Sequence, residues 1–166
     1  DLINTFKNTL IFDYLILNKT FIGEMLESYQ KEDFTTQQWT LISANPGIKM
    51  ADIISHPEYS WNVMGLSRNP NITEQMITKF GTDKQWDAFQ LANNPGLTID
   101  IVKMFSDDFW QDCWGDITKN PGIQAVDIIE NDLPWVSENI SSNPNLDISH
   151  IKLPFPNQYQ INLEDV

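Results

Sequence analysis

The apolar positions of this chain recur at a nearly constant spacing, and every recurrence is centred on an Asn-Pro pair. The asparagines of these pairs are Asn45, Asn69, Asn94, Asn120 and Asn143, at spacings of 24, 25, 26 and 23 residues. When each asparagine is numbered zero, position −3 holds Ile or Leu, position −2 a small residue, position +3 Ile or Leu, and position +8 Ile or Val in all five copies. Self-similarity at such a period indicates a tandem-repeat architecture.

Each copy is expected to contain two short helices, one on either side of its Asn-Pro pair. The first helix ends there because proline lacks the N–H that would continue it and disfavours the helical conformation in the preceding residue. The asparagine side chain is expected to close an Asx-type turn at this corner. At position +4, Thr73, Thr98 and Asp147 are good N-cap residues for the second helix. Lys49 and Gln124 cap poorly at that position, so their helices are expected to start differently.

Tryptophan also keeps register with the copies, in two ways. Trp61, Trp86 and Trp135 stand at position −8, whereas Trp39 and Trp114 stand at position −6. Two residues apart on a helix means different faces, so the rings could fill one gap from two sides. The pattern leaves open which arrangement applies.

The fold class predicted from these patterns is all-α, as an α-solenoid of about six 24-residue two-helix repeats. Helices this short are marginal alone, so stacking on neighbours must supply their burial. The solenoid is expected to span residues 1–152, with units starting near residues 18, 45, 69, 94, 120 and 143. The unit at Asn18 is degenerate, because Lys19 replaces the proline, and terminal repeats that act as caps are normally atypical.

Residues 153–166 break the repeat pattern and are expected to form a C-terminal extended arm. Pro154 and Pro156 forbid a continuing helix. The arm either packs across the last unit as a cap, the interpretation we favour, or docks on another chain by strand addition.

Two of the repeated phrases resemble known repeat families. The phrase "LSRNPNIT" at residues 66–73, preceded by Trp61, resembles short tandem repeats of giant DNA virus proteins, whose unit runs Trp-x-Trp and then Leu-Ser-x-Asn-Pro-Asn-Ile-Thr. The phrase "LANNPGLT" at residues 91–98 is similar to bacterial leucine-rich-repeat-variant units, which build a superhelix of alternating short helices. The resemblance covers roughly residues 12–152. It implies a helical-repeat fold and a viral origin, and neither family implies a defined catalytic activity.

The charge and composition narrow the classes of partner. The net charge is −13 and Arg68 is the only arginine, which argues against binding to a phosphate backbone. No apolar run is long enough for a transmembrane helix, so no membrane association is expected. Cys113 is the only cysteine, which excludes an intramolecular disulfide and fits a reducing compartment. Together with the resemblance to viral repeats, this implies an intracellular location, in a host cytoplasm or a virion. Because the chain begins with Asp1 rather than Met, we expect a fragment or a processed product.

The residues that could carry chemistry are few, and we expect no enzyme activity, catalytic residue, cofactor or metal. His56 and His150 lie 94 residues apart, without a metal-binding spacing, and Cys113 has no neighbouring base in the sequence. Asp108, Asp112 and Asp116 follow at i, i+4 and i+8 and are expected on one helical face. That stripe is either a site for a cation or a basic partner, or simply a solvated face.

The remaining candidate for function is the surface, since solenoids usually bind proteins on faces that vary between units. One edge consists of the positions just after each proline (Gly47, Asn71, Gly96, Gly122 and Asn145). The other consists of the segments between a second helix and the next tryptophan, and we expect the partner there. The residues predicted to bind it are Glu58, Tyr59, Asp83, Lys84, Asp107, Asp108 and Asp132.

The predicted function is a non-enzymatic scaffold for protein–protein interaction or virion structure, with basic proteins or viral coat proteins as partners. An alternative is a substrate-recognition or regulatory domain of a larger enzyme. A weaker alternative is an acidic mimic of nucleic acid, which the net charge of −13 would suit. The oligomeric state does not follow from the sequence.

Overall fold

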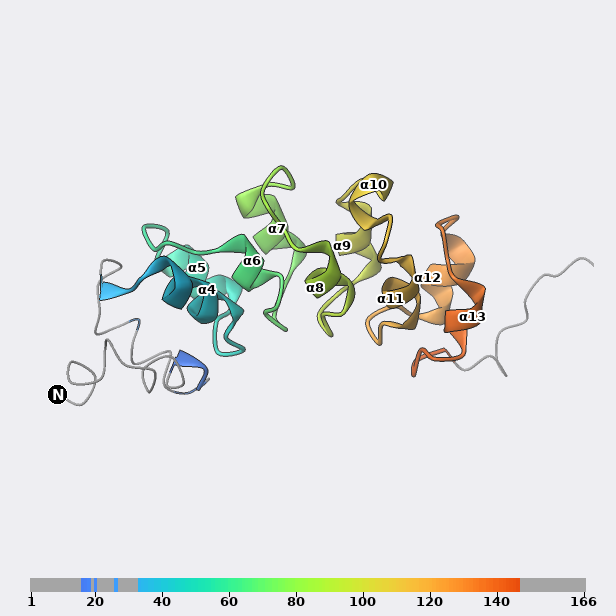
Figure 1. Cartoon of the computed structure of the whole chain (residues 1–166), viewed down its shortest axis with the longest axis horizontal. Coiled ribbons are helices and arrows are strands. Elements are labelled where there is room, and N and C mark those ends of the chain that lie inside the picture. The colour runs from blue at the N-terminus through green and yellow to red at the C-terminus, as the bar shows by residue number, and fades with distance from the viewer. Residues whose placement is uncertain (1–15, 19, 21–25, 27–32, 147–166) are drawn as a thin grey trace, which may run out of the picture.

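A computed structural model describes residues 16–18, 20, 26 and 33–146, and every regular element in this part of the chain is a helix. The prediction of an all-helical class is therefore confirmed for the described residues. The elements are α4 (Thr36–Ala44), α5 (Met50–Ser55), α6 (Val63–Leu66), α7 (Glu74–Phe80), α8 (Ala88–Ala92), α9 (Ile99–Lys103), α10 (Asp107–Trp110), α11 (Trp114–Lys119), α12 (Ala125–Glu130) and α13 (Ser137–Ile140). Figure 1 shows them following one another in chain order along the long axis of the molecule.

The Asn-Pro pairs separate helices that fall into two groups. We call α4, α6, α8, α11 and α13 the first helices, because each precedes an Asn-Pro pair, and α5, α7, α9 and α12 the second helices. First helices contact first helices, α4 against α6 and α11 against both α8 and α13, while α7 contacts α9. Helix α10 belongs to neither group and is inserted between α9 and α11. The Asn-Pro turns lie along one long edge of the molecule, and the linkers from each second helix to the next first helix lie along the opposite edge (Figure 1).

The second helices all begin at the same register position. Thr73 Oγ1 accepts a hydrogen bond from Met76 N (3.3 Å), and Thr98 caps α9 in the same way. The expectation that α5 and α12 start differently is wrong, since both also begin directly after position +4. At Lys49 the backbone N–H donates to the Asp52 carboxylate (2.7 Å), and Gln124 makes the equivalent bond to Asp127. A carboxylate in the first turn thus accepts from the N–H of the cap residue itself, and it is also favoured by the helix dipole.

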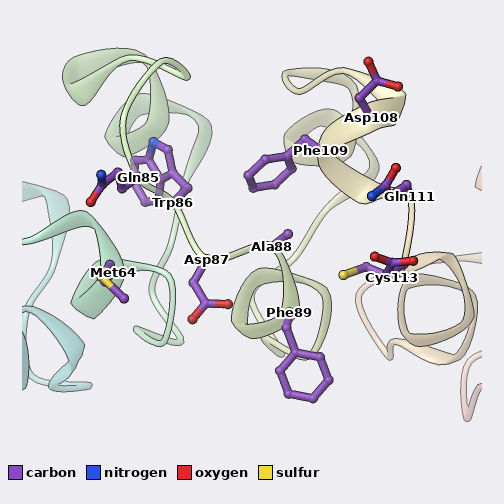
Figure 2. A pocket seen from close by; sticks show the side chains of 11 residues that line it. Met64, Gln85, Trp86, Asp87, Ala88, Phe89, Asp108, Phe109, Gln111 and Cys113 are labelled. Carbon is purple, nitrogen blue, oxygen red and sulfur yellow. The ribbon is translucent and has the colours of Figure 1, made fainter.

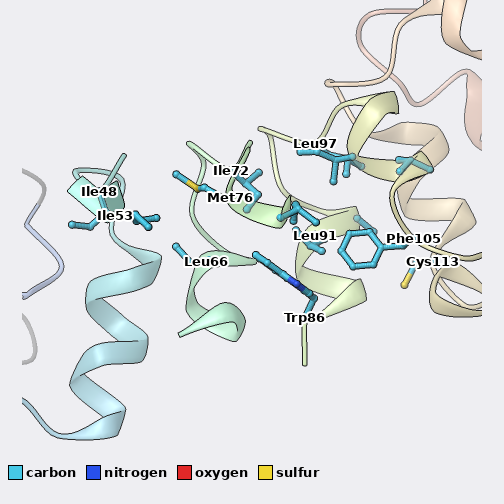
Figure 3. Packing of buried hydrophobic residues seen from close by; sticks show 14 of the residues in the cluster. Ile48, Ile53, Leu66, Ile72, Met76, Trp86, Leu91, Leu97, Phe105 and Cys113 are labelled. Carbon is cyan, nitrogen blue, oxygen red and sulfur yellow. The ribbon is translucent and has the colours of Figure 1, made fainter. Parts of the chain in front are cut away.

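One buried apolar cluster runs through the described helices. The residues at position −3 are fully buried in α4, α6, α8 and α11, and those at position +3 are at most 7% exposed. Figure 3 shows side chains such as Ile48, Leu66, Ile72 and Leu91 in a row that passes from one copy to the next. The apolar columns of successive copies therefore belong to one continuous buried cluster.

Five described residues belong to the degenerate copy at Asn18. Thr20 N donates to Asn18 Oδ1 (3.0 Å), which is an Asx turn in the expected register. Leu26, at position +8, is only 5% exposed, and Ile16 is fully buried. The rest of this copy, residues 147–152 with Asp147 and His150, and the predicted arm at 153–166 lie outside the described residues.

Candidate functional site

The asparagines of the five Asn-Pro pairs form what we call the asparagine ladder. All five side chains are at most 3% exposed. Each carboxamide oxygen accepts a hydrogen bond from the backbone N–H two residues later, for example from Gly96 to Asn94 (2.8 Å), so the predicted Asx turns are confirmed. Each carboxamide nitrogen donates to the preceding copy. Asn94 Nδ2, for example, lies 2.8 Å from Ser67 O and 2.9 Å from Asn69 O.

The ladder repeats with the same partners along the chain. Asn69, Asn120 and Asn143 donate to the residue at position −2 and to the asparagine of the copy before, at 2.7–3.0 Å. Asn45 donates to Ile16 O, which is position −2 when Asn18 is zero. Among the described residues no buried side-chain polar atom lacks a hydrogen-bond partner. Replacing one of these buried asparagines would therefore leave backbone N–H and C=O groups without hydrogen-bond partners, which explains why every copy has one.

The small residue at position −2 has a role that its size alone did not reveal. Its hydroxyl accepts a hydrogen bond from the backbone N–H just before the first helix of the next copy. Ser43 accepts from Asn62 N (2.9 Å), Ser67 from Asp87 N (3.0 Å) and Thr118 from Val136 N (3.1 Å). Sequence reasoning missed this link, although Ser or Thr at four of the five positions was the signal for it.

The tryptophans at position −8 close the second helices. Trp61 Nε1 donates to His56 O (2.8 Å), Trp86 Nε1 to Gly81 O (2.9 Å) and Trp135 Nε1 to Asn131 O (2.9 Å). Each acceptor is the C-cap residue of the preceding second helix. The indole N–H thus donates to a carbonyl group that has no hydrogen-bond partner within its own helix.

The tryptophans at position −6 meet those at position −8 of the next copy. Trp39 packs edge-to-face on Trp61 with ring centroids 5.6 Å apart, and Trp114 does so on Trp135 at 5.9 Å. These pairs settle the question that the sequence left open, since the two rings approach one gap from adjacent copies. Trp110, which sequence reasoning passed over, is fully buried and donates from Nε1 to Val102 O (2.9 Å), near the end of α9.

The residues predicted to bind a partner all lie in the linkers of one edge, but the structure does not gather them into a single site. Glu58 is exposed and lies 3.5 Å from His56 Nδ1. Asp83 and Lys84 are exposed and pair with each other at 3.2 Å. The other exposed acids lie further along this edge: Asp107 and Asp108 in α10, and Asp132 after α12.

Tyr59 differs from the other predicted residues because it takes part in the fold. Its ring stacks on His56 with centroids 4.6 Å apart, and its hydroxyl donates to Leu26 O (2.8 Å). Burial, together with the Glu58 carboxylate, raises the pKa of the Tyr59 phenol. Its contacts therefore hold the Asn45 copy against residues of the copy before it.

The acidic stripe expected on one helical face does not exist. Helix α10 ends at Trp110 and α11 begins at Trp114, so Asp108, Asp112 and Asp116 do not share one helix. Asp116 pairs with Lys119 at 2.8 Å. In the described segments no group of three or more His, Cys, Asp or Glu side chains could hold a metal ion. Helical spacing misled the prediction because the chain turns at residues 111–113.

A hollow lies between α8 and α10, and we call it the α8–α10 groove. Its volume is about 490 Å³. The lining residues are Met64, Gln85, Trp86, Asp87, Ala88, Phe89, Asp108, Phe109, Gln111, Asp112 and Cys113. Figure 2 shows the Trp86 and Phe109 rings on opposite sides of the opening, while the Phe89 ring points away from both. Three of the lining residues are aspartates and none is basic, so the groove joins apolar walls to an acidic rim.

The single thiol of the chain, Cys113, lies in this groove and is only 6% exposed. Burial raises its pKa, and the Asp116, Asp112 and Asp87 carboxylates raise it further. A thiolate is the reactive form of cysteine, so these surroundings suppress nucleophilic chemistry.

The opposite edge is occupied by contacts between copies. Asn71 Nδ2 donates to Pro46 O (2.7 Å), and Asn145 makes the equivalent bond to Pro121 O. Where glycine stands at this position the backbones approach closely, and a Cβ added at Gly96 would lie 2.5 Å from Pro70 O. The residues after each proline therefore join the copies together.

No described helix could cross a lipid bilayer, since the longest has nine residues and about 20 apolar residues are needed.

Comparisons with known proteins leave the site to be interpreted from its own geometry. The likeness of the Asn-Pro phrases to viral and bacterial repeats stays a prediction. No protein-family model, no curated protein and no solved structure matches this chain.

Proposed function

We propose that the chain is an α-solenoid of stacked two-helix repeats that acts as a non-enzymatic scaffold and binds a protein partner along its linker edge. The asparagine ladder is the observation that carries the architecture. Each carboxamide is used at a joint between two copies, at sequence separations of 20 to 29 residues. A stack of units that contact mainly their neighbours is the defining property of a solenoid.

The different use of the two edges supports the position of the partner. The Asn-Pro edge is filled by hydrogen bonds and close backbone contacts between copies. On the linker edge, Glu58, Asp83, Asp108 and Asp132 are exposed, and the linkers differ in length and sequence. Variable exposed side chains on a rigid stack are the usual binding surface of repeat proteins.

The resemblance to repeats of giant DNA virus proteins adds a more specific form of the proposal. In that form the partner is a viral coat protein or another basic protein, and the chain resides in a host cytoplasm or a virion. The net charge of −13 suits a basic partner through electrostatic complementarity.

Crosslinking of the whole chain in its native source, followed by mass spectrometry of the crosslinked peptides, tests the proposed function. We expect a partner that binds saturably and crosslinks to the linkers between second and first helices. Crosslinks that map only to the Asn-Pro edge, or no saturable partner at any salt concentration, would overturn the proposal. Crosslinks between the linkers of two molecules of this chain would indicate that the scaffold acts in virion assembly.

A further inference from the structure

The α8–α10 groove lies where the joint between two copies changes. The copy at Asn94 has Ala92 at position −2, so the hydroxyl that links Ser43, Ser67 and Thr118 to the next copy is missing there. The backbone N–H of Cys113, which occupies the equivalent donor position, bonds instead to Trp110 O at 2.7 Å. The linker that carries α10 is therefore joined to itself, while the asparagine ladder continues beside it through Asn120. An opening remains between α8 and α10.

The apolar walls of the groove are held in fixed positions. The Trp86 indole is tied to Gly81 O (2.9 Å). On the other wall, Phe109 stacks on Phe105 with centroids 4.3 Å apart and meets Trp110 edge-to-face at 4.7 Å. Aromatic side chains that are rigid before binding lose little entropy on binding, and they are the common anchors of protein interfaces.

The exposed apolar residues beside the groove are not required by the fold. Met64 and Phe89 both stand at position −5 of their copies and are 43% and 58% exposed. The other three copies carry Thr40, Gly115 and Glu138 at this position. Two of the three copies that line the groove, those at Asn69 and Asn94, thus carry an apolar residue at position −5, and the other copies do not. This local departure points to a ligand rather than to packing.

The negative charge of the groove favours a positively charged ligand. Asp87, Asp108 and Asp112 line it without a basic residue among the lining side chains, and the nearby Lys119 is already paired with Asp116. The chain's own segment 153–166 contains no Lys or Arg, and a second molecule of this chain would bring a net charge of −13. Both are therefore poorer electrostatic matches to the three carboxylates than a basic segment of another protein. A cationic side chain would be attracted by these carboxylates, and it would also lie beside the partly exposed ring of Phe109, since aromatic faces attract cations.

We infer that the α8–α10 groove binds a peptide segment of a partner protein that presents an arginine or lysine next to a bulky apolar residue. The cationic group would lie between the aspartates and the aromatic walls, and the apolar neighbour would cover Phe89 and Met64. This assignment rests on the proposed protein-binding function and names the partner's chemistry at one position of the linker edge.

A peptide library of random sequence, displayed on phage and selected against the whole chain, tests the inference. We expect selected peptides to carry Arg or Lys beside Leu, Phe, Met or Trp. Their affinity, measured by fluorescence polarisation, should fall at least about tenfold, or about 1.4 kcal/mol, in the double variant Asp108→Asn with Asp112→Asn. The matched control is Asp100→Asn with Glu130→Gln, which changes the net charge equally at exposed sites of the second helices, outside the groove.

A second pair of variants tests the apolar half without altering charge. Phe89→Ser should weaken peptide binding. Ile54→Ser should not, because Ile54 is equally exposed (59%, against 58% for Phe89) but lies outside the groove. Equal losses in each pair, or selected peptides without a basic residue, would overturn the inference, as would a failure to select any peptide. In that case a native partner crosslinked elsewhere on the linker edge would leave the proposed function standing, whereas the absence of any saturable partner would remove both.

Discussion

Replacement of Asn94 by alanine is the sharpest test of the asparagine ladder. The Asn94 side chain is 3% exposed, and its oxygen accepts from Gly96 N while its nitrogen donates to Ser67 O and Asn69 O. Asn69 O keeps a second bond, from Ile72 N (3.0 Å), so the groups that lose a described partner are Gly96 N–H and Ser67 O. Each buried group left unpaired costs about 1–3 kcal/mol. The expected loss is therefore about 2–6 kcal/mol.

The adjacent Asn93 provides a matched control for this variant. Asn93 is exposed, and its carboxamide makes one bond, to Phe89 O (3.0 Å) within the same copy. Asn93→Ala should cost less than about 1 kcal/mol, because water can replace the lost partner. Urea unfolding followed by far-UV circular dichroism measures both variants. A stable domain has only about 5–15 kcal/mol in total, so the difference is readily resolved. Equal losses in the two variants would refute the role assigned to the ladder.

Three further predictions concern packing and the thiol. Gly122→Ala should destabilise the chain by about 1–3 kcal/mol, because its Cβ would collide with a main-chain oxygen of the preceding copy. Gly115→Ala should cost less, since its Cβ would meet only a side-chain amide at 2.8 Å, and an equal cost in thermal unfolding would contradict the argument. Leu66→Ala should cost about 2–5 kcal/mol at a fully buried site, whereas Asp112→Asn, at an exposed one, should leave the urea midpoint nearly unchanged; the reverse order would refute the repeat register. Cys113 should react slowly with iodoacetamide at mildly alkaline pH and faster in urea, because its raised pKa keeps the thiolate scarce in the folded chain; equal rates would contradict its burial.

The parts of the fold that the sequence predicted depend on local chemistry. Proline ends a helix through its own backbone geometry, so the boundary at each Asn-Pro pair could be placed without knowing any neighbour. The same holds for the Asx turns and for the Thr73 and Thr98 caps, whose partners lie two or three residues away. The apolar columns also predicted burial, although Ile128 and Ile140 at the C-terminal end are only partly buried.

What escaped prediction depends on partners in another copy. The sequence shows Ser67 only as a small residue, because the group that donates to its hydroxyl, Asp87 N at 3.0 Å, belongs to the next copy. The structural role of Trp110 likewise depends on its hydrogen bond to Val102 O, which the sequence does not reveal. The acidic stripe failed for the converse reason, because i, i+4 spacing assumes a continuous helix. The α8–α10 groove was not predicted for both of these reasons. It forms where Ala92 lacks the hydroxyl that links other copies and where α10 interrupts the regular helix pattern.

The hydrogen bonds of the asparagine ladder have a direction, which bears on how the chain is made. Asn69 donates to the Asn45 copy, Asn94 to the Asn69 copy, and Asn120 to the Asn94 copy. The tryptophan and hydroxyl links also run from a donor in the later copy to an acceptor in the earlier one. Because a ribosome releases the N-terminal residues first, each new asparagine emerges opposite carbonyl groups that are already in place. The polarity of the joints thus matches the polarity of translation, since every acceptor is synthesised before its donor.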